Sequence, residues 1–338
     1  LAEGLNLVVS AHGPEVYLMK CDGEIVHRWN CPRNKAFPDL ARTKSDKKAR
    51  SFRRAYVLPD RSLVGIYNGT GMVKLSSESE IIWTQPAMCH HDLCFSPDYK
   101  QIYTIIQKRR LFPAINKDEE VMDEEITVLN AENGESLRQF SLLEAFHGSE
   151  YSPMLRKAPS SGDVLHANTV RYVTEAQAAK VPVCQVGDIL FSVRNMDTIG
   201  FLDMETGRVR WALTGLWAVQ HEPTILENGN ILVFDNSGNK GKSRVIEINP
   251  LTHEVVWKYT GEEGRSLNSE TSGSCSRLPN GNTLIIESNR GRAIEVTPDK
   301  EIVWEYQNPG RWGPRKDLRA TLFDVQRIPE EYFNSVLS

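Results

Sequence analysis

Three histidines occupy matching positions in three successive copies of a strand pattern. His91 opens the segment HDLCFSPDYKQ and His221 opens HEPTILENGNI, so each precedes a turn by the same offset and each is followed by an acid. His166 opens the corresponding segment between them. Val or Ile would serve core packing better at such positions. Because matching positions of a radial repeat converge on one axial channel, we interpret the three imidazoles as a functional cluster.

Further polar side chains fall near the same end of the predicted strands. Asn168 is two residues after His166 and therefore on the same strand face. Arg194 ends a strand, and its guanidinium can hold a tetrahedral anion through paired hydrogen bonds. We expect five catalytic residues: His91, His166, Asn168, Arg194 and His221. We expect four substrate-binding residues: His90, Glu222, Asn236 and Arg290. Strand alternation turns His90 away from the channel if His91 points into it.

Three kinds of chemistry fit three imidazoles, an amide and a guanidinium. In the first, one histidine is a nucleophile that accepts a transferred group, and the others stabilise charge or move protons. In the second, His91, His166 and His221 bind a divalent metal such as zinc and serve a hydrolase or lyase. In the third, the side chains bind a ligand without turnover. Residue chemistry alone leaves the first two open.

A repeated strand pair must position these side chains. Six copies of an apolar strand, a turn and a strand ending in an aromatic residue occur at residues 16–29, 72–83, 126–140, 199–211, 245–257 and 293–304. Polar and apolar residues alternate along the strands, and the turns of three copies contain an Asp-Gly, Asn-Gly or Thr-Gly pair. A second strand pair precedes each of five copies. Each unit therefore has four strands, as in a propeller blade.

The count of strands predicts how the repeat closes. Five complete blades run from about residue 53 to 304, the first 29 residues supply three strands, and residues 321–328 supply a fourth. The sequence thus predicts an all-β, six-bladed β-propeller, a single domain over residues 1–338, with its sixth blade shared by the two chain ends. Residues 107–125 and 142–162 break the rhythm as insertions. The second either covers the channel mouth or is a surface excursion.

Composition excludes several classes of partner. The formal charge is −4 without a basic stripe, which argues against nucleic acid, and the basic run at residues 44–54 reads as a solvated loop. No apolar stretch is long enough to span a membrane. The six cysteines show no CxxC spacing. Cys21 with Cys31, and Cys89 with Cys94, are possible disulfide pairs that spacing leaves open.

Four segments carry a resemblance to a known family. They are His90-His91-Asp92, His166-Ala167-Asn168, residues 187–195 followed by DMETGRVRW at 203–211, and Gln220-His221-Glu222 running into residues 228–231. Their order and spacing resemble the bacterial arylsulfotransferases that do not use the nucleotide sulfate donor. The resemblance extends from residue 13 to residue 304.

This resemblance implies transfer of a sulfuryl group from an aryl sulfate to a phenol, without a cofactor. His221 matches the histidine that becomes sulfated in the family. His91, His166, Asn168 and Arg194 match the residues that hold the sulfuryl oxygens and assist proton transfer. Together with the absent initial methionine, the resemblance implies a mature periplasmic or extracellular protein after signal removal.

The sequence also departs from the family pattern. The family's N-terminal β-domain, linked to dimer formation, has no counterpart before the propeller strands, which leaves the oligomeric state open. Residues 203–220 contain no cysteine, where the family has a short disulfide loop close to the nucleophile. Glu222 stands where aspartate is common. These differences leave the natural donor and acceptor open.

Overall fold

Small antiparallel sheets make up most of the protein. The computed structural model describes residues 1–40, 50–313 and 317–330, so residues 44–49 of the basic run lie outside the described ranges. Within these ranges six sheets each contain four antiparallel strands, and one of them has a short fifth strand that pairs in parallel. This is the arrangement of a six-bladed β-propeller, and the predicted fold class is confirmed. The chain comprises two compact units, each with three blades.

The first unit, Leu1–Cys89 with Leu267–Ser338, contains the blade shared by the chain ends. Its strand order is β29-β1-β2-β3, with β29 pairing with β1, which confirms the predicted closure. These strands are β29 (Leu322–Ile328), β1 (Leu5–Ser10), β2 (Glu15–Met19) and β3 (Ile25–Asn30). The other two blades are β4 (Arg54–Val57), β5 (Leu63–Tyr67), β6 (Gly71–Leu75), β7 (Ile81–Pro86), and β23 (Ser274–Arg277), β24 (Thr283–Glu287), β25 (Arg292–Val296), β26 (Ile302–Gln307).

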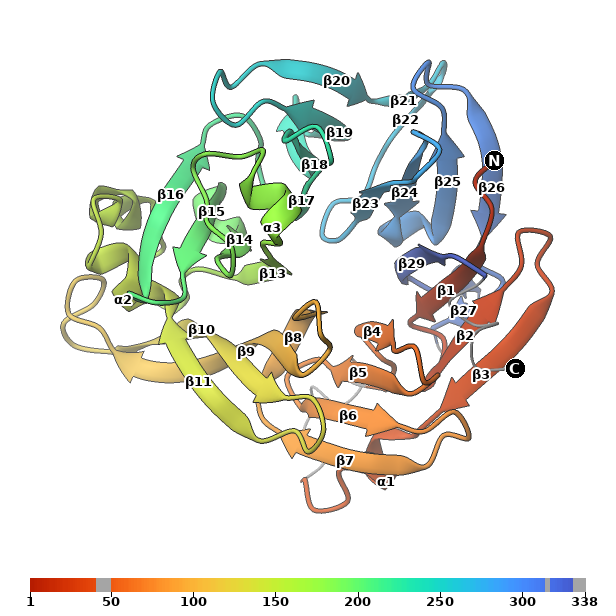
Figure 1. Ribbon diagram of the computed structural model, residues 1–338, viewed down its shortest axis with the longest axis horizontal. Coiled ribbons are helices and arrows are strands. Elements are labelled where there is room, and N and C mark those ends of the chain that lie inside the picture. The colour runs from red at the N-terminus through yellow and green to blue at the C-terminus, as the bar shows by residue number, and fades with distance from the viewer. Residues whose placement is uncertain (41–49, 314–316, 331–338) are drawn as a thin grey trace. The chain divides into compact units, whose positions relative to one another are not determined.

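The second unit, His90–Ser266, contains the three blades of His91, His166 and His221. The first is β8 (Cys89–Phe95), β9 (Gln101–Leu111), β10 (Glu120–Asn130) and β11 (Ser136–Ser141). The next two are β13 (Ala167–Tyr172), β14 (Ile189–Val193), β15 (Thr198–Asp203), β16 (Arg208–Thr214), and β17 (His221–Ile225), β18 (Ile231–Asn239), β19 (Lys242–Ile248), β20 (Val255–Tyr259). Within this unit β8, β13 and β17 lie on one side of their blades and β11, β16 and β20 on the other (Figure 1).

Short elements connect the blades. Two small hairpins are β21 (Gly261–Glu262) with β22 (Arg265–Ser266), and β27 (Arg311–Trp312) with β28 (Leu318–Arg319). The short helices outside the insertions are α1 (Arg33–Ala36), α3 (Glu175–Ala178), η3 (Arg194–Met196) and η4 (Ser288–Arg290). Among the described residues, no helix combines the length and apolar character that crossing a bilayer requires.

The insertion at residues 107–125 is a continuation of a blade hairpin. β9 and β10 are each 11 residues long, whereas β14 in the next blade has 5. Their pairing runs without interruption from Gln101 opposite Asn130 to Leu111 opposite Glu120. The extra residues therefore lengthen the two middle strands of the blade.

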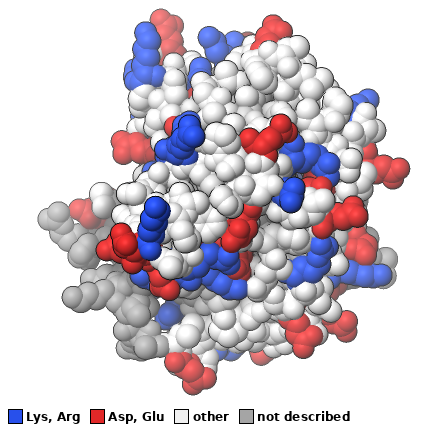
Figure 2. Space-filling view, turned by 90° about the vertical axis from the view of Figure 1, so that its left-hand side faces the viewer, with Lys and Arg blue, Asp and Glu red and all other residues white. Residues whose placement is uncertain are grey.

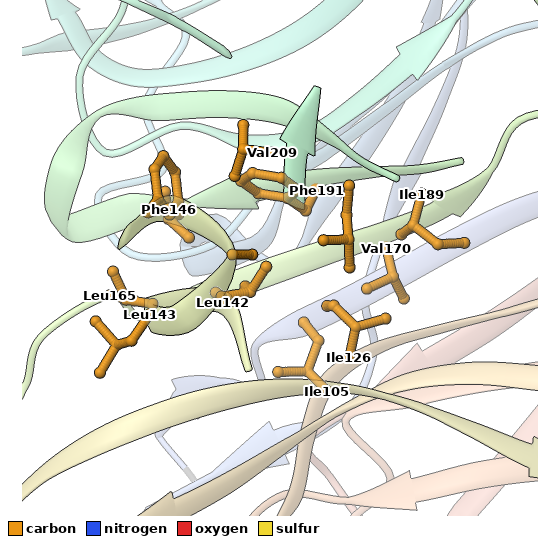
Figure 3. Close-up of a cluster of buried hydrophobic side chains, with 14 of the residues drawn as sticks. Ile105, Ile126, Leu142, Leu143, Phe146, Leu165, Val170, Ile189, Phe191 and Val209 are labelled. Atoms are coloured by element: carbon orange, nitrogen blue, oxygen red, sulfur yellow. The ribbon is translucent and has the colours of Figure 1, made fainter. Parts of the chain in front are cut away.

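The insertion at residues 142–162 contributes to the hydrophobic core. It forms α2 (Leu142–His147) and η2 (Ser152–Lys157), and the following β12 (Gly162–Asp163) pairs in parallel with β10. Leu142 and Phe146 are buried, and the Phe146 ring lies 5.7 Å from that of Phe191 in β14 (Figure 3). The apolar face of α2 is thus part of the core of this unit, while Glu144 and His147 on its other face are exposed.

One strand of this core requires a glycine. Gly200 in β15 lies against the ring of Phe191, and a Cβ atom at this position would be 2.8 Å from Cζ of that ring. Only glycine leaves room for the aromatic ring to pack against the backbone of this strand. On the outside, charged side chains of both signs are interspersed over the face seen in Figure 2, in keeping with the small net charge.

Candidate functional site

The histidines stand where the first strands of their blades begin with irregular backbone. His91 and His166 have φ of 57° and 52°, and Glu222, which follows His221, has φ of 54°. These values lie in the left-handed region that is strained for residues other than glycine. The strand pairing also shifts register between Ala167 and Thr169 and between His221 and Thr224. Such bulges re-aim side chains, so simple alternation does not apply here.

His90 and His91 illustrate the consequence. Their Nδ1 atoms lie 2.5 Å apart, and their rings meet edge to face with centroids 4.8 Å apart. Regular alternation would place neighbouring side chains on opposite faces of the strand, and the positive φ of His91 breaks the pleat between these two residues and lets their rings meet.

The ring of His221 is held through Nδ1. This atom lies 3.0 Å from the main-chain oxygen of Val219 and 2.8 Å from Oδ1 of Asn236. Both neighbours are hydrogen-bond acceptors, so we assign the proton of the neutral ring to Nδ1. Nε2 is then the basic nitrogen. The side chain is 2% exposed. Asn236, expected to bind substrate, thus contacts His221.

His166 is anchored in the same way by a carboxylate. Its Nδ1 lies 2.5 Å from Oδ2 of Asp163, and its main-chain N–H donates to Oδ1 over 3.0 Å. Burial acts to raise the pKa of Asp163, but the hydrogen bond from His166 and the charges of His166 and His90 outweigh it, so the pKa is lowered. The carboxylate therefore stays ionised and orients the His166 ring. Sequence reasoning missed Asp163, although its position three residues before His166 is a local signal.

A second carboxylate reaches His90. Nε2 of His90 lies 2.6 Å from Oε2 of Glu124 in β10, and both side chains are buried. The rings of His91 and His166 are in turn 4.9 Å apart. A continuous series of contacts therefore runs from Glu124 through His90 and His91 to His166 and Asp163. His90, expected to bind substrate, lies inside this series. Glu124 was also missed, since nothing in the sequence links residue 124 to residue 90.

Arg194 lies beside His166. Its main-chain N–H donates to the carbonyl oxygen of His166 over 3.1 Å, and Nη1 lies 3.3 Å from Oδ1 of Asn195. Asn195 itself donates to the main-chain oxygen of Asp163 over 2.7 Å. In the described part of the chain, no carboxylate forms an ion pair with Arg194, which is partly exposed. A cation without an ion-pair partner favours binding of an anion.

Asn168 supports the segment that carries His221. Its Nδ2 donates to the main-chain oxygen of Gln220 over 2.8 Å, and the side chain is 2% exposed. Gln220 is itself fully buried and its Nε2 donates to Oγ of Ser192 over 2.9 Å. The peptide immediately before His221 is therefore fixed from both its main chain and its side chain. Gln220 is a further positioning residue, to which the sequence analysis assigned no role although it stands next to His221.

The acids that follow His91 and His221 share one arginine. Arg171 in β13 forms ion pairs with both Asp92 in β8 and Glu222 in β17. Asp92 also accepts a hydrogen bond from the main-chain N–H of Val170 over 2.9 Å. Glu222, expected to bind substrate, thus takes part in a link between the first strands of three neighbouring blades.

Arg290 lies in the other unit. It ends η4, and its Nη1 is 2.8 Å from Oε1 of Glu287. The structure therefore places eight of the nine expected site residues in the second unit, and Arg290 in the first.

The described residues contain neither a metal-binding cluster nor a disulfide. Over residues 1–40, 50–313 and 317–330, no group of three or more His, Cys, Asp and Glu side chains is arranged to hold a metal ion. All six cysteines fall in these ranges and each is a free thiol, so neither possible pair is bonded. Burial raises the pKa of the Cys89 and Cys94 thiols to about 12, which makes them poor nucleophiles.

Comparison with solved structures shows the fold. A protein of unknown function from Bacteroides caccae is 12% identical, with a TM-score of 0.58 over 94% of this chain and 97% of that one. A functionally unknown protein from Desulfotomaculum acetoxidans is 10% identical, with a TM-score of 0.52 over 95% of this chain and 99% of that one. A virginiamycin B lyase from Staphylococcus aureus is 12% identical, with a lower TM-score of 0.45 over 75% of this chain and 69% of that one.

Sequence comparison identifies the family. No curated protein matches the chain. The family described as arylsulfotransferase (ASST) matches residues 55–309, which include every expected site residue and the complete blades of His91, His166 and His221. The chain therefore belongs to the arylsulfotransferase (ASST) family.

Proposed function

We propose that this protein transfers a sulfuryl group from an aryl sulfate to a phenol, in two steps through a sulfated His221. Membership of the family supports sulfotransferase activity in general. The observation that supports this mechanism is the hydrogen bonding of His221: Nδ1 donates to the oxygens of Val219 and Asn236, so Nε2 has the lone pair that a nucleophile needs.

In the first step, Nε2 of His221 attacks the sulfur atom of the donor. A nitrogen–sulfur bond forms, the bond from sulfur to the aryl oxygen breaks, and the phenolate leaves with the electron pair. A neighbouring imidazolium, on His91 or His166, gives that oxygen a proton. The oxygens at Nδ1 offset the positive charge that appears on the His221 ring.

Charge on the sulfuryl oxygens requires a fixed cation. Arg194 supplies one beside His166, without an ion-pair partner among the described residues. Removing such a donor typically costs about 10²–10³ in rate. Asn168 acts in this proposal through Gln220, by fixing the peptide that carries His221.

In the second step, the acceptor phenol gives its proton to the same imidazole that supplied one before. The phenol oxygen then attacks sulfur, the nitrogen–sulfur bond breaks, and His221 returns to its neutral form. Over the two steps the imidazole gives up one proton and takes up one, so the cycle neither releases nor consumes protons. The proposal requires neither an organic cofactor nor a metal.

A paired assay tests the proposal. Metal-analysed protein is given p-nitrophenyl sulfate with and without phenol, and with and without chelator. The variants are His221→Ala and, as a matched control, His253→Asn, which changes an exposed histidine of the same unit with φ of 61°. We expect the release of nitrophenol to depend on phenol and to be unaffected by chelator. We expect this activity to be absent in His221→Ala and retained in His253→Asn.

Other outcomes of this assay separate the alternatives. Full activity of His221→Ala contradicts the proposed nucleophile. Chelator-sensitive turnover with stoichiometric metal supports a metal-dependent hydrolase or lyase at His91, His166 and His221. Absence of turnover, with ligand binding that survives loss of these histidines, supports a non-catalytic propeller.

The family resemblance also supports a location outside the cytoplasm, so we propose that the mature protein is periplasmic or extracellular. Cell fractionation followed by immunodetection tests this. Detection only in the cytoplasmic fraction contradicts it.

A further inference from the structure

The two insertions that interrupt the repeat meet beside the histidines. β10, in the lengthened hairpin, pairs on one side with β9 and on another with β12, which follows the second insertion. In this pairing Met122 lies opposite Asp163. Glu124 is two residues further along β10 from Met122, and Asp163 follows the second insertion. The two insertions therefore bring in the carboxylates that contact His90 and His166.

Glu124 is held in a defined orientation. Its Oε1 accepts a hydrogen bond from Nε2 of Gln107 over 3.1 Å, and its Oε2 contacts Nε2 of His90 at 2.6 Å. Gln107 lies opposite Glu124 in the lengthened hairpin. The carboxylate is 0% exposed, and no lysine or arginine among the described residues forms an ion pair with it. A buried carboxylate is costly unless it is paired, and the hydrogen bond with His90 compensates the charge of Glu124.

The donor and the acceptor can be assigned in both contacts, that of Glu124 with His90 and that of His90 with His91. An ionised carboxylate only accepts, so Nε2–H of His90 donates to Glu124. Nδ1 of a neutral His90 is then an acceptor, and the 2.5 Å contact requires Nδ1–H of His91 to donate to it. Nε2 of His91 is consequently the nitrogen that exchanges a proton with a substrate. Two hydrogen bonds thus connect the buried charge of Glu124 to the reactive nitrogen of His91.

We propose that Glu124 is a positioning residue that acts through His90 to make His91 the acid and base of the reaction. This inference rests on the proposed function. In the first step, Nε2–H of His91 gives its proton to the aryl oxygen while the sulfur–oxygen bond breaks. In the second step, Nε2 takes a proton from the acceptor phenol. The charge of Glu124 offsets the positive charge of His91 in its protonated form.

The same geometry distinguishes His91 from His166. His166 has its own carboxylate in Asp163, and the main chain of Arg194 donates to its carbonyl oxygen. The main-chain hydrogen bond keeps Arg194 next to His166 in the fold, and a guanidinium with an imidazole oriented by a carboxylate is suited to binding the sulfuryl oxygens. Proton transfer is therefore assigned to His91 and anion binding to His166 with Arg194.

The leaving group of the donor provides the first test. Glu124→Gln keeps an oxygen acceptor and the side-chain shape but removes the charge. Glu125→Gln is the matched control, since Glu125 is the next residue of β10, is also buried, and pairs with Lys108 and Arg110. Proton donation matters most when the departing phenolate is strongly basic. We expect Glu124→Gln to lower kcat/KM for phenyl sulfate about tenfold or more, and kcat/KM for p-nitrophenyl sulfate much less, because this constant reports the first step alone. Glu125→Gln should leave the ratio of the two rates unchanged.

Equal losses with both donors, or no loss, would overturn the role of Glu124 in proton transfer. A merely structural effect of the substitution lowers both rates together, so the ratio separates the two roles. Urea unfolding of each variant accompanies the kinetics and reports any loss of folding.

A second measurement is independent of sulfuryl transfer. Proton NMR of the native chain should show a low-field imidazole N–H signal, which His90→Gln removes and Glu124→Gln shifts upfield. If the native protein turns over no aryl sulfate, the proposed function fails, while this signal still decides whether Glu124 and His90 are linked. Absence of the signal from the native chain contradicts the relay even where sulfuryl transfer is observed.

Discussion

Asp163 holds His166 at two points, since its Oδ2 contacts the ring Nδ1 at 2.5 Å and its Oδ1 accepts the main-chain N–H over 3.0 Å. The first bond fixes which ring nitrogen carries the proton. The second fixes the backbone at a residue with φ of 52°, where a side chain is strained. One carboxylate therefore sets both the direction and the tautomer of a site imidazole.

Replacing Asp163 should make stability less dependent on acid pH. The folded-state pKa of Asp163 is lowered, so its contribution to the free energy of unfolding is complete above the unfolded pKa of about 3.9 and is lost as pH falls through the folded pKa. We expect Asp163→Asn to be less stable than the native chain at neutral pH, and the difference to shrink below about pH 4. Urea unfolding across this range measures it. A difference that stays constant with pH would refute the assigned ion pair.

Asn236 should matter for kcat more than for KM. Asn236→Leu keeps the approximate volume but removes one of the two acceptors at Nδ1 of His221, leaving the oxygen of Val219. We expect kcat to fall about tenfold or more, because the ring loses part of what fixes its tautomer. Steady-state kinetics with p-nitrophenyl sulfate and phenol measure this. Unchanged kcat would show that Val219 alone orients the ring.

Lysine should not replace Arg194. The planar guanidinium can bind two oxygens at once, whereas an ammonium is a single point charge. We expect both Arg194→Lys and Arg194→Gln to lower kcat by roughly 10²-fold, with Gln at least as damaging. Arg208→Gln, at an exposed position in β16 of the same blade, is the control and should retain activity. Full activity in Arg194→Lys would mean that charge alone suffices.

Arg171 should contribute to stability rather than chemistry. Arg171→Met removes the cation shared by the buried carboxylates of Asp92 and Glu222. Breaking a buried ion pair by removing one partner costs about 3–5 kcal/mol. The triple variant with Asp92→Asn and Glu222→Gln should recover much of this loss, because it removes the buried charges as well. Urea unfolding compares the variants, and a loss below about 1 kcal/mol in Arg171→Met would contradict the role of this link.

Asp123 should make the folded protein more stable in mild acid. Burial raises its pKa to about 6, although hydrogen bonds from Ser141, Leu143 and Glu124 and the charge of Arg110 act in the opposite direction. Between about pH 4 and 6 the folded state then binds more protons than the unfolded state, so this contribution to the free energy of unfolding falls as pH rises. Asp123→Asn should remove that part of the slope. An identical slope in both proteins would exclude a raised pKa.

The blades and their order were predictable from the sequence because strand alternation and turn residues repeat six times. The shared sixth blade followed from counting strands, and β29 pairs with β1 as expected. The register of His91, His166 and His221 was visible for the same reason. These features depend on local patterns that recur along the chain.

The residues that hold the histidines in place were not predictable in the same way. Glu124 reaches His90 only because residues 107–125 lengthen a hairpin, and β12 lies beside β10 through a parallel pairing that no turn signal announces. The contact between His90 and His91 depends on a positive φ, which alternation rules do not foresee. α2 packs inside because Leu142, Leu143 and Phe146 form an apolar face within a segment that broke the repeat.

The central claim is that His221 carries the sulfuryl group between the two substrates. The most direct measurement is to mix the protein with p-nitrophenyl sulfate in the absence of a phenol, stop the reaction, and map the modified peptide by mass spectrometry. The account predicts one added SO₃ group on His221, a stoichiometric burst of nitrophenol, and loss of the modification when phenol is added. A burst with no modification of His221, or turnover by His221→Ala, would contradict it.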